Sequence, residues 1–401
     1  MAKQIKHPNF PEFITLMALF ISLMAMSIDM ILPALALIGQ EFSITNENQT
    51  QYVIGILFLG FTFGQIIFGP ISDSFGRKPT VYIGLVIFII GCLCSIAATS
   101  FPMLLFGRFL QGFGASSPRI SCMAIIRDLY KGREMARVMS FVMTIFIIVP
   151  VVAPSIGQLI LLFANWRMIF AIFFIAALAA TLLTIFRLPE TLKTNDIRPF
   201  NARAIWHDFC KVVSNKITLG YTICAGLVFG ALIGYLTSSP QIFQDYFQVG
   251  ELFPLYFALS ALSIGAASIT NSMIVRRYGM KFICHRALIL MIAMSIIFLA
   301  LSFLQPEGLP LWQFMIYALV TFFCLGLLFG NLNALAMEPM GHLAGIASAL
   351  VGSLSSAISV TLGTLIGQAY NGTLMPMFVG FLLLASAAFI VQFWLGRNSA
   401  Q

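Results

Sequence analysis

Charged side chains are scarce in this chain: Asp, Glu, Lys and Arg together account for 9% of its 401 residues. A water-soluble domain carries about 25% charged residues. Hydrophobic residues account for 60% of the chain, so water cannot cover a surface built mainly from them. The shortage of charge therefore excludes a soluble globular protein and predicts that lipid covers much of the chain.

Groups needed for several kinds of chemistry are also missing. The sequence has no Gly-x-x-x-x-Gly-Lys-Ser/Thr loop, so ATP is not expected to drive the protein directly. Its seven Cys residues lack the spacing of a zinc or redox motif. There is no metal cluster, no nucleophile constellation and no acid at bilayer depth other than Asp29. The chain is therefore not expected to be an enzyme or to hold a metal or cofactor.

Long apolar runs dominate what is present, and twelve of them are long enough to cross a bilayer. They predict an all-α membrane protein. We place them at 13–38, 51–71, 80–99, 102–124, 138–163, 167–187, 217–239, 253–274, 283–304, 311–335, 343–369 and 374–395.

The distribution of positive residues predicts the orientation of these segments. With the N-terminus in the cytoplasm, all but three of the 22 Lys and Arg residues fall on the cytoplasmic side, the exceptions being Arg108, Arg119 and Arg167. Both termini are then cytoplasmic. Attraction of the basic loops to an anionic inner leaflet accounts for the net charge of +8 without nucleic acid as a partner.

The longest hydrophilic stretch divides the segments into six and six. We predict an N-terminal bundle over 1–190, a cytoplasmic linker over 191–216 and a C-terminal bundle over 217–401. An internal repeat supports two related halves, because Gly76 and Lys78 after the second segment match Gly279 and Lys281 after the eighth. Two six-helix halves around a central path are typical of secondary transporters.

Asp29 is the most informative residue, because it is the one acid placed at bilayer depth. A charge at a helix centre costs roughly 2.5–3.5 kcal/mol on insertion scales, so it needs a partner, water or a function. Burial favours the protonated form of a carboxyl group, which suits a group that takes up and releases a proton. Pro33, one turn later, removes a backbone hydrogen bond and loosens the helix there. A permanent ion pair with an Arg is the structural alternative.

Arg119 follows Arg108 by eleven positions in the fourth segment, close to three helical turns, so the two side chains share nearly one face. With Asp29 ionised, the deep charges sum to +1, which favours an anionic or zwitterionic substrate over a lipophilic cation. The alternatives are that Arg119 reaches to the cytoplasmic end of the helix or pairs with Asp128.

The stretch Gly69-Pro-Ile-Ser-Asp73-Ser-Phe-Gly76-Arg77-Lys78 resembles the loop signature of the major facilitator superfamily. Further motifs resemble its Bcr/CflA-type multidrug exporters, which are twelve-helix drug/proton antiporters. These motifs are Leu32–Leu35 after Asp29, Arg108–Gly114, Val149–Gly157 with Ala153 in place of the usual Gly, Arg127-Asp128, Asn165–Arg167 and Leu188–Leu192. The likeness is weaker in the second half, where Arg276 replaces the acid of the repeated loop.

The resemblance implies roles for two sets of these residues. Asp29 and Arg108 are expected to couple transport to protons. Five residues, Gly69, Asp73, Gly76, Arg77 and Lys78, are expected to latch the two halves in the outward-open state, with Arg77 and Lys78 at the inner surface. Apart from the resemblance, gating and sealing are assigned to Pro33, Pro150, Pro154 and Gly157, because proline kinks and small residues let helices bend and approach closely. Plain helix packing is the alternative for Pro150, Pro154 and Gly157.

Polar groups within apolar segments complete the expected substrate cavity. They are Asp29, Gln65, Gln111, Arg119, Gln158, Tyr235, Asn331 and Asn333. Each of the last three is also explained by a hydrogen bond between helices.

Together these features predict a monomeric, proton-driven exporter of drug-like small molecules in a bacterial cytoplasmic membrane, working by alternating access. Its partners are the substrate, protons and lipid. Two alternatives remain open. One keeps the fold and exports an endogenous anionic metabolite, such as a siderophore or an amino-acid derivative. The other is a non-transporting membrane receptor or assembly factor, which the intact loop and antiporter motifs disfavour.

Overall fold

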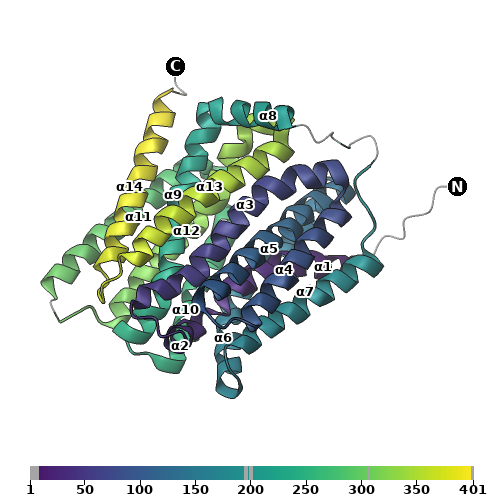
Figure 1. The fold of residues 1–401 in the computed structure, drawn as a ribbon. Helices are drawn as coiled ribbons and strands as arrows, with labels where there is room; N and C mark the ends of the chain where they lie inside the picture. Colours follow the sequence, from purple (N-terminus) through teal and green to yellow (C-terminus); the bar gives the residue numbers. More distant parts are fainter. Residues whose placement is uncertain (1–8, 194–196, 198–201, 306, 399–401) are drawn as a thin grey trace. The chain divides into compact units, whose positions relative to one another are not determined.

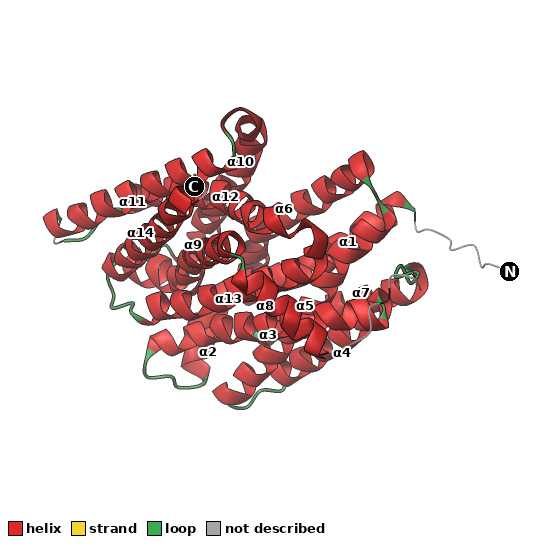
Figure 2. Ribbon diagram, turned by 90° about the horizontal axis from the view of Figure 1, so that it is seen from above, coloured by secondary structure: helices red, strands yellow, loops and turns green. Residues whose placement is uncertain are grey.

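The computed structural model describes residues 9–193, 197, 202–305 and 307–398. Within these residues every regular element is a helix, and Figure 2 shows them joined by loops and turns. The two chain ends lie outside the described residues, so their cytoplasmic placement stays a prediction. The helices of the first part of the chain are α1 (Phe10–Asp29), η1 (Leu32–Ala34), α2 (Leu35–Glu41), η2 (Glu47–Gln51), α3 (Tyr52–Phe75), α4 (Arg77–Ile96), α5 (Phe101–Leu129), α6 (Gly132–Phe163) and α7 (Arg167–Arg187).

The remaining helices follow the same pattern of long apolar segments (Figure 1). They are α8 (Ala202–Ser214), α9 (Lys216–Gln241), η4 (Ile242–Tyr246), η5 (Gly250–Leu252), α10 (Phe253–Tyr278), α11 (Met280–Leu304), α12 (Leu311–Met337), η6 (Glu338–Leu343), α13 (Ala344–Gln368) and α14 (Met375–Asn398).

Eleven helical stretches in the described part are long and apolar enough to cross a membrane. They coincide with eleven of the twelve predicted segments, and the remaining segment, 102–124, is α5. This helix has 29 residues, and at 1.5 Å per residue it is about 44 Å long, enough to cross a bilayer. Arg108, Arg119, Arg127 and Asp128 all lie in it, which lowers its hydropathy. The prediction of an all-α membrane fold is confirmed.

The chain forms two compact units. Unit 1 comprises residues 1–34 and 56–206, and unit 2 comprises 35–55 and 207–401. In unit 1, α1 packs against α5, α6 and α7, and α4 packs against α5 and α7. In unit 2, α9 packs against α12, α13 and α14, while α12 also packs against α10 and α11.

Glycines allow a close helix crossing in unit 1. A Cβ atom added at Gly60 of α3 would overlap the backbone oxygen of Phe109 in α5. The converse holds on the other helix, where a Cβ at Gly112 would overlap the backbone oxygen of Leu57. Small residues let helices in a membrane approach closely. The glycines therefore fix α5, which carries both deep arginines, directly against α3.

Residues 35–55 are held on unit 2 by a set of amide side chains. Asn48 Nδ2 donates to the Gln368 backbone oxygen at 3.1 Å, and Gln368 Nε2 donates back to the Asn48 backbone oxygen at 2.6 Å. Gln241 Nε2 donates to Asn48 Oδ1 at 2.9 Å, and Gln51 Nε2 donates to Gln241 Oε1. The η2 turn, which contains Asn48 and Gln51, thus joins the C-terminal ends of α9 and α13.

Helix α8 was not foreseen, because it lies in the stretch expected to be a hydrophilic linker. Its side chains at Phe209, Val212 and Val213 line a common surface with Leu219 of α9 and Leu350 of α13. The segment is too polar to be found as a span, yet one face of it is apolar. Figure 1 shows α8 lying across the ends of α9 and α13.

Candidate functional site

Asp29 is the last residue of α1, where the structure differs from the continuous helix expected over 13–38. Pro33 explains the break, because it has no N–H to donate to the backbone oxygen four residues earlier, which belongs to Asp29. The chain turns instead through Met30 and Ile31 into η1, with the Ala34 N–H donating to Ile31 O at 2.9 Å. The break therefore sits directly at the deep carboxyl group.

The Asp29 side chain is buried, with 4% of its surface exposed. Among the residues that the structure describes, none forms a hydrogen bond or ion pair with its carboxyl group. The alternative of a permanent pair with an Arg is therefore not observed in the described part. A buried carboxyl group without a partner is costly when ionised. Its charge state then depends on whether water, a proton or a ligand reaches it.

Arg108 of α5 is fully buried. Its Nη2 donates to the backbone oxygen of Ser27 at 2.7 Å, and its Nη1 donates to Gln111 Oε1 at 2.7 Å. Gln111 Nε2 in turn donates to Ser95 Oγ at 3.0 Å. Ser27 lies two residues before Asp29, so this network ties the end of α1 to α5 and α4.

Gly157 of α6 touches the break after Asp29. A Cβ atom added at Gly157 would overlap the backbone oxygen of Met30, the residue that follows Asp29. Helix α6 continues through Pro150 and Pro154 without interruption. Of the predicted gating residues, the structure thus brings Pro33 and Gly157 to the turn beside Asp29. Their part in gating stays a proposal.

Arg119 of α5 is half-buried and lies over two aromatic rings. Its Cζ is 5.2 Å from the ring centroid of Phe61 in α3 and 5.9 Å from that of Phe146 in α6. It makes no ion pair with any described carboxylate. The alternative pairing with Asp128 is not seen, since Asp128 accepts from Arg77 instead.

The other predicted cavity residues are dispersed. Tyr235 is buried, and its hydroxyl donates to Ser260 Oγ at 3.4 Å. Asn331 Nδ2 donates to Asn271 Oδ1 at 2.7 Å, which clamps α12 to α10. Asn333 Nδ2 bonds to the backbone oxygen one turn earlier at 2.9 Å. These contacts match the helix-to-helix alternative for Tyr235 and Asn331.

Two further glutamines of the predicted cavity lie in unit 1. Gln65 is half-buried in α3 and has a partner within the described residues. Gln158 is half-buried in α6, next to Gly157. Any role of these glutamines in substrate binding remains a proposal.

The segment resembling a loop signature is mostly helical. Gly69 and Asp73 belong to the last turns of α3, and only Gly76 separates α3 from α4. Gly76 has a φ of 108°, and its counterpart Gly279 between α10 and α11 has a φ of 78°. Both values lie where an L side chain is strained. The internal repeat therefore has the same backbone turn in each unit.

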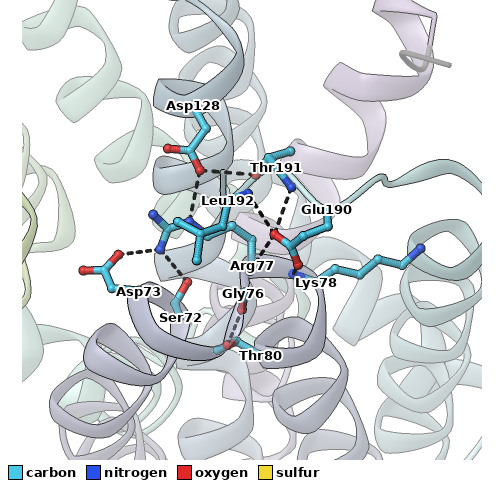
Figure 3. Close-up of polar contacts among 10 residues, drawn as sticks. All are labelled: Ser72, Asp73, Gly76, Arg77, Lys78, Thr80, Asp128, Glu190, Thr191 and Leu192. Atoms are coloured by element: carbon cyan, nitrogen blue, oxygen red, sulfur yellow. Dashed lines mark hydrogen bonds and ion pairs between the residues drawn. The ribbon is translucent and has the colours of Figure 1, made fainter. Parts of the chain in front are cut away.

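Arg77 is buried, with 4% of its surface exposed. Figure 3 shows its guanidinium between the carboxylates of Asp73 and Asp128. Nε donates to Asp128 Oδ2 at 3.0 Å, and Nη1 donates to Asp73 and to Ser72 Oγ at 3.0 Å. Partners from α3 and α5 replace the water that the cation would lose on burial.

Glu190, after α7, completes this cluster. Its carboxylate accepts from the backbone N–H groups of Arg77 at 3.0 Å and Lys78 at 3.1 Å (Figure 3). Gly76 at the N-cap of α4 has no side chain to satisfy these donors, and a negative charge is favoured at a helix N-terminus. Thr191 Oγ1 donates to Asp128 Oδ2 at 3.2 Å. Four segments of unit 1 therefore meet at Arg77.

Replacing Glu190 with Ala is expected to loosen the start of α4. The variant loses two hydrogen bonds to the helix N-terminus and a favourable charge, worth about 1–2 kcal/mol together. Hydrogen–deuterium exchange of the amides of residues 77–80 should then be about tenfold faster than in the unchanged protein.

Glu251→Ala is the matched control, because Glu251 is exposed in η5 and far along the chain from α4. Exchange at 77–80 should not change in this variant. Equal exchange in Glu190→Ala and the unchanged protein would show that Glu190 does not hold the helix start.

Sequence reasoning missed several of these contacts. Glu190 stands out in the sequence only as part of the motif Leu188–Leu192. Its contact with the start of α4 depends on the turn at Gly76, 114 positions earlier. The aromatic rings beside Arg119 come from two other helices. No group of three or more His, Cys, Asp and Glu residues in the described ranges could hold a metal ion.

Comparisons with known proteins agree with this architecture. The profile of the Major Facilitator Superfamily matches residues 16–364. An uncharacterized MFS-type transporter YdgK of Bacillus subtilis (strain 168) is 31% identical over 348 residues, 85% of each chain. A bicyclomycin resistance protein homolog of Haemophilus influenzae is 30% identical over 375 residues, 91% of each chain.

A solved structure shows the same fold at low sequence identity. The xylose transporter XylE from E. coli, in a partially occluded inward-open conformation, superimposes with a TM-score of 0.72 at 14% identity. The match covers 97% of this chain and 99% of that one. The family profile matches most of the chain. The two compact helical units and the Arg77 cluster at the start of α4 agree with that match. The chain belongs to the Major Facilitator Superfamily.

Proposed function

We propose that this protein is a proton-coupled exporter of drug-like small molecules in a bacterial cytoplasmic membrane. One observation carries the proposal: the Asp29 carboxyl group is buried at a helix break and has no hydrogen-bond or ion-pair partner among the described residues. Such a group binds a proton when it is dry and releases it when water or a cation reaches it. The bicyclomycin resistance homolog supports a drug-like cargo.

The mechanism is alternating access between two bundles, 1–190 and 217–401, joined by 191–216. Substrate enters from the cytoplasm while Asp29 is ionised. Protonation of Asp29 from the outside then favours release of the substrate, and the proton leaves on the cytoplasmic side. The turn at Pro33 and its contact with Gly157 are the parts of unit 1 that respond first, since they adjoin Asp29. Arg108, bound to Ser27 O, positions this end of α1.

The other assigned parts follow the same scheme. The Arg77 cluster is the latch of the cycle, and the protein works as a monomer with both termini in the cytoplasm.

A second candidate function is export of an endogenous anionic metabolite. Arg119 favours it, because this cation has no carboxylate partner within the described part. Both functions use the same proton site.

Reconstituted vesicles test the proposal. Vesicles with an acidic lumen and the membrane potential clamped at zero should take up a transported dye, and uptake should stop when nigericin collapses the pH difference. Ethidium, a lipophilic cation, and tetramethylrhodamine, which bears a carboxylate, are tested side by side. Uptake of either dye that is unaffected by nigericin would contradict proton coupling.

A further inference from the structure

Arg119 presents a guanidinium whose central carbon lies over two aromatic rings. Phe61 comes from α3 and Phe146 from α6, so the cation sits where these helices meet α5. Phe61 is buried, with 4% of its surface exposed, while Arg119 and Phe146 are half-buried. Rings attract a cation through their faces. The arrangement therefore holds the guanidinium at a fixed place in unit 1.

The guanidinium also has hydrogen-bond donors to satisfy. Its N–H groups point outward in the plane of the group, and contacts with ring faces do not satisfy them. Among the described residues, no acceptor takes a hydrogen bond from Arg119. An arginine edge matches a carboxylate, with two parallel hydrogen bonds. A carboxylate is therefore the kind of partner that suits this group.

Two carboxylates of unit 1, those of Asp128 and Asp73, are bound to Arg77. Asp128, the acid closest in sequence on α5, accepts from Arg77 and Thr191. Asp73 also accepts from Arg77. A cation within a membrane helix is costly unless it faces water or a partner. Arg119 therefore carries a positive charge that unit 1 does not neutralise in its described part.

We propose that Arg119, held by Phe61 and Phe146, binds the carboxylate of an anionic or zwitterionic aromatic substrate. This inference rests on the proposed transport function, because it names the class of cargo. The half-buried ring of Phe146 also supplies apolar surface for the aromatic part of such a compound. A neutral ester of the same compound lacks the group that Arg119 binds.

Two dyes with one ring system test the proposal. Tetramethylrhodamine carries a free carboxylate and is a zwitterion, whereas its methyl ester is a cation of nearly the same shape. Binding to the purified protein in nanodiscs is measured by fluorescence anisotropy, with empty nanodiscs as background. We expect the acid to bind about 10- to 100-fold more tightly than the ester, as for a charge-assisted bidentate contact.

Variants separate the contact from general effects. Arg119→Gln should remove the preference for the acid, and Arg119→Lys should retain only part of it because the planar fork is lost. Arg137→Gln is the control: Arg137 also lies over a ring, 5.0 Å from the centroid of Phe10, but is exposed on α6. This control should keep the full preference.

The outcomes distinguish this inference from the proposed function. Equal binding of the two dyes, no binding of the acid, or a preference that survives Arg119→Gln would overturn the inference. Proton-driven uptake of the ester with such a result would leave the transport function standing. A second result would retain the binding site and reject proton coupling. In it, the preference for the acid is lost only in the Arg119 variants, and dye uptake does not depend on the pH difference.

Discussion

Asp29→Asn is expected to abolish proton-driven accumulation of substrate while leaving the fold and substrate binding in place. Asparagine keeps the size of the side chain but cannot bind and release a proton. A pH difference of one unit sustains about tenfold accumulation for each proton exchanged. The unchanged protein should approach this ratio, and the variant should stay near an accumulation of about one. Exchange of labelled for unlabelled dye across the membrane should persist.

Proton release gives a direct measurement of the same step. Detergent-solubilised protein in weak buffer should release protons when tetramethylrhodamine or ethidium is added, and Asp29→Asn should release none. Asp245→Asn serves as control, since Asp245 is an exposed acid in η4. Release that persists in Asp29→Asn would remove Asp29 from the coupling step and leave it a structural role.

Gly157→Ala is expected to impair transport strongly for a change of one methyl group. The added Cβ would overlap backbone atoms of Met30, which cannot rotate away as a side chain could. Either α6 or the turn after Asp29 must shift, at a cost of about 1–3 kcal/mol. Because this turn adjoins the proposed proton site, we expect about a tenfold slower proton-driven uptake and a lower melting temperature.

Gly330→Ala is the matched control, because nothing lies within 4 Å of a Cβ added there. Alanine in a helix is at least as favourable as glycine, so this variant should be as stable and active as the unchanged protein. Uptake in Gly157→Ala equal to that in Gly330→Ala would show that the contact with Met30 does not control the turn.

The membrane helices were predictable because each is encoded locally by an apolar run. Even α5 was found, although Arg108, Arg119 and Arg127 make it less apolar than the others. Helix α8 was missed for the opposite reason: only one of its faces is apolar, so its average composition resembles a linker. The boundaries of the two bundles at 190 and 217 stay predictions.

The candidate site was predictable in its residues but not in its contacts. Asp29 stood out because a lone acid at bilayer depth is costly, and Pro33 indicated that the helix weakens there. The burial of Arg77 could not be foreseen, because its partners Asp128 and Glu190 belong to distant segments. Likewise, Arg119 was read from its charge alone, whereas the rings beside it depend on how three helices pack.

The amide contacts of residues 35–55 have a consequence for how the chain is assembled during synthesis. Asn48 and Gln51 leave the ribosome early, yet their partners Gln241 and Gln368 are made roughly 190 and 320 residues later. By contrast, the cluster around Arg77 is complete once Thr191 has emerged. Domains generally fold in the order of synthesis. One short stretch near the start of the chain must therefore wait, with its polar groups hydrated, until nearly the last helix has been inserted.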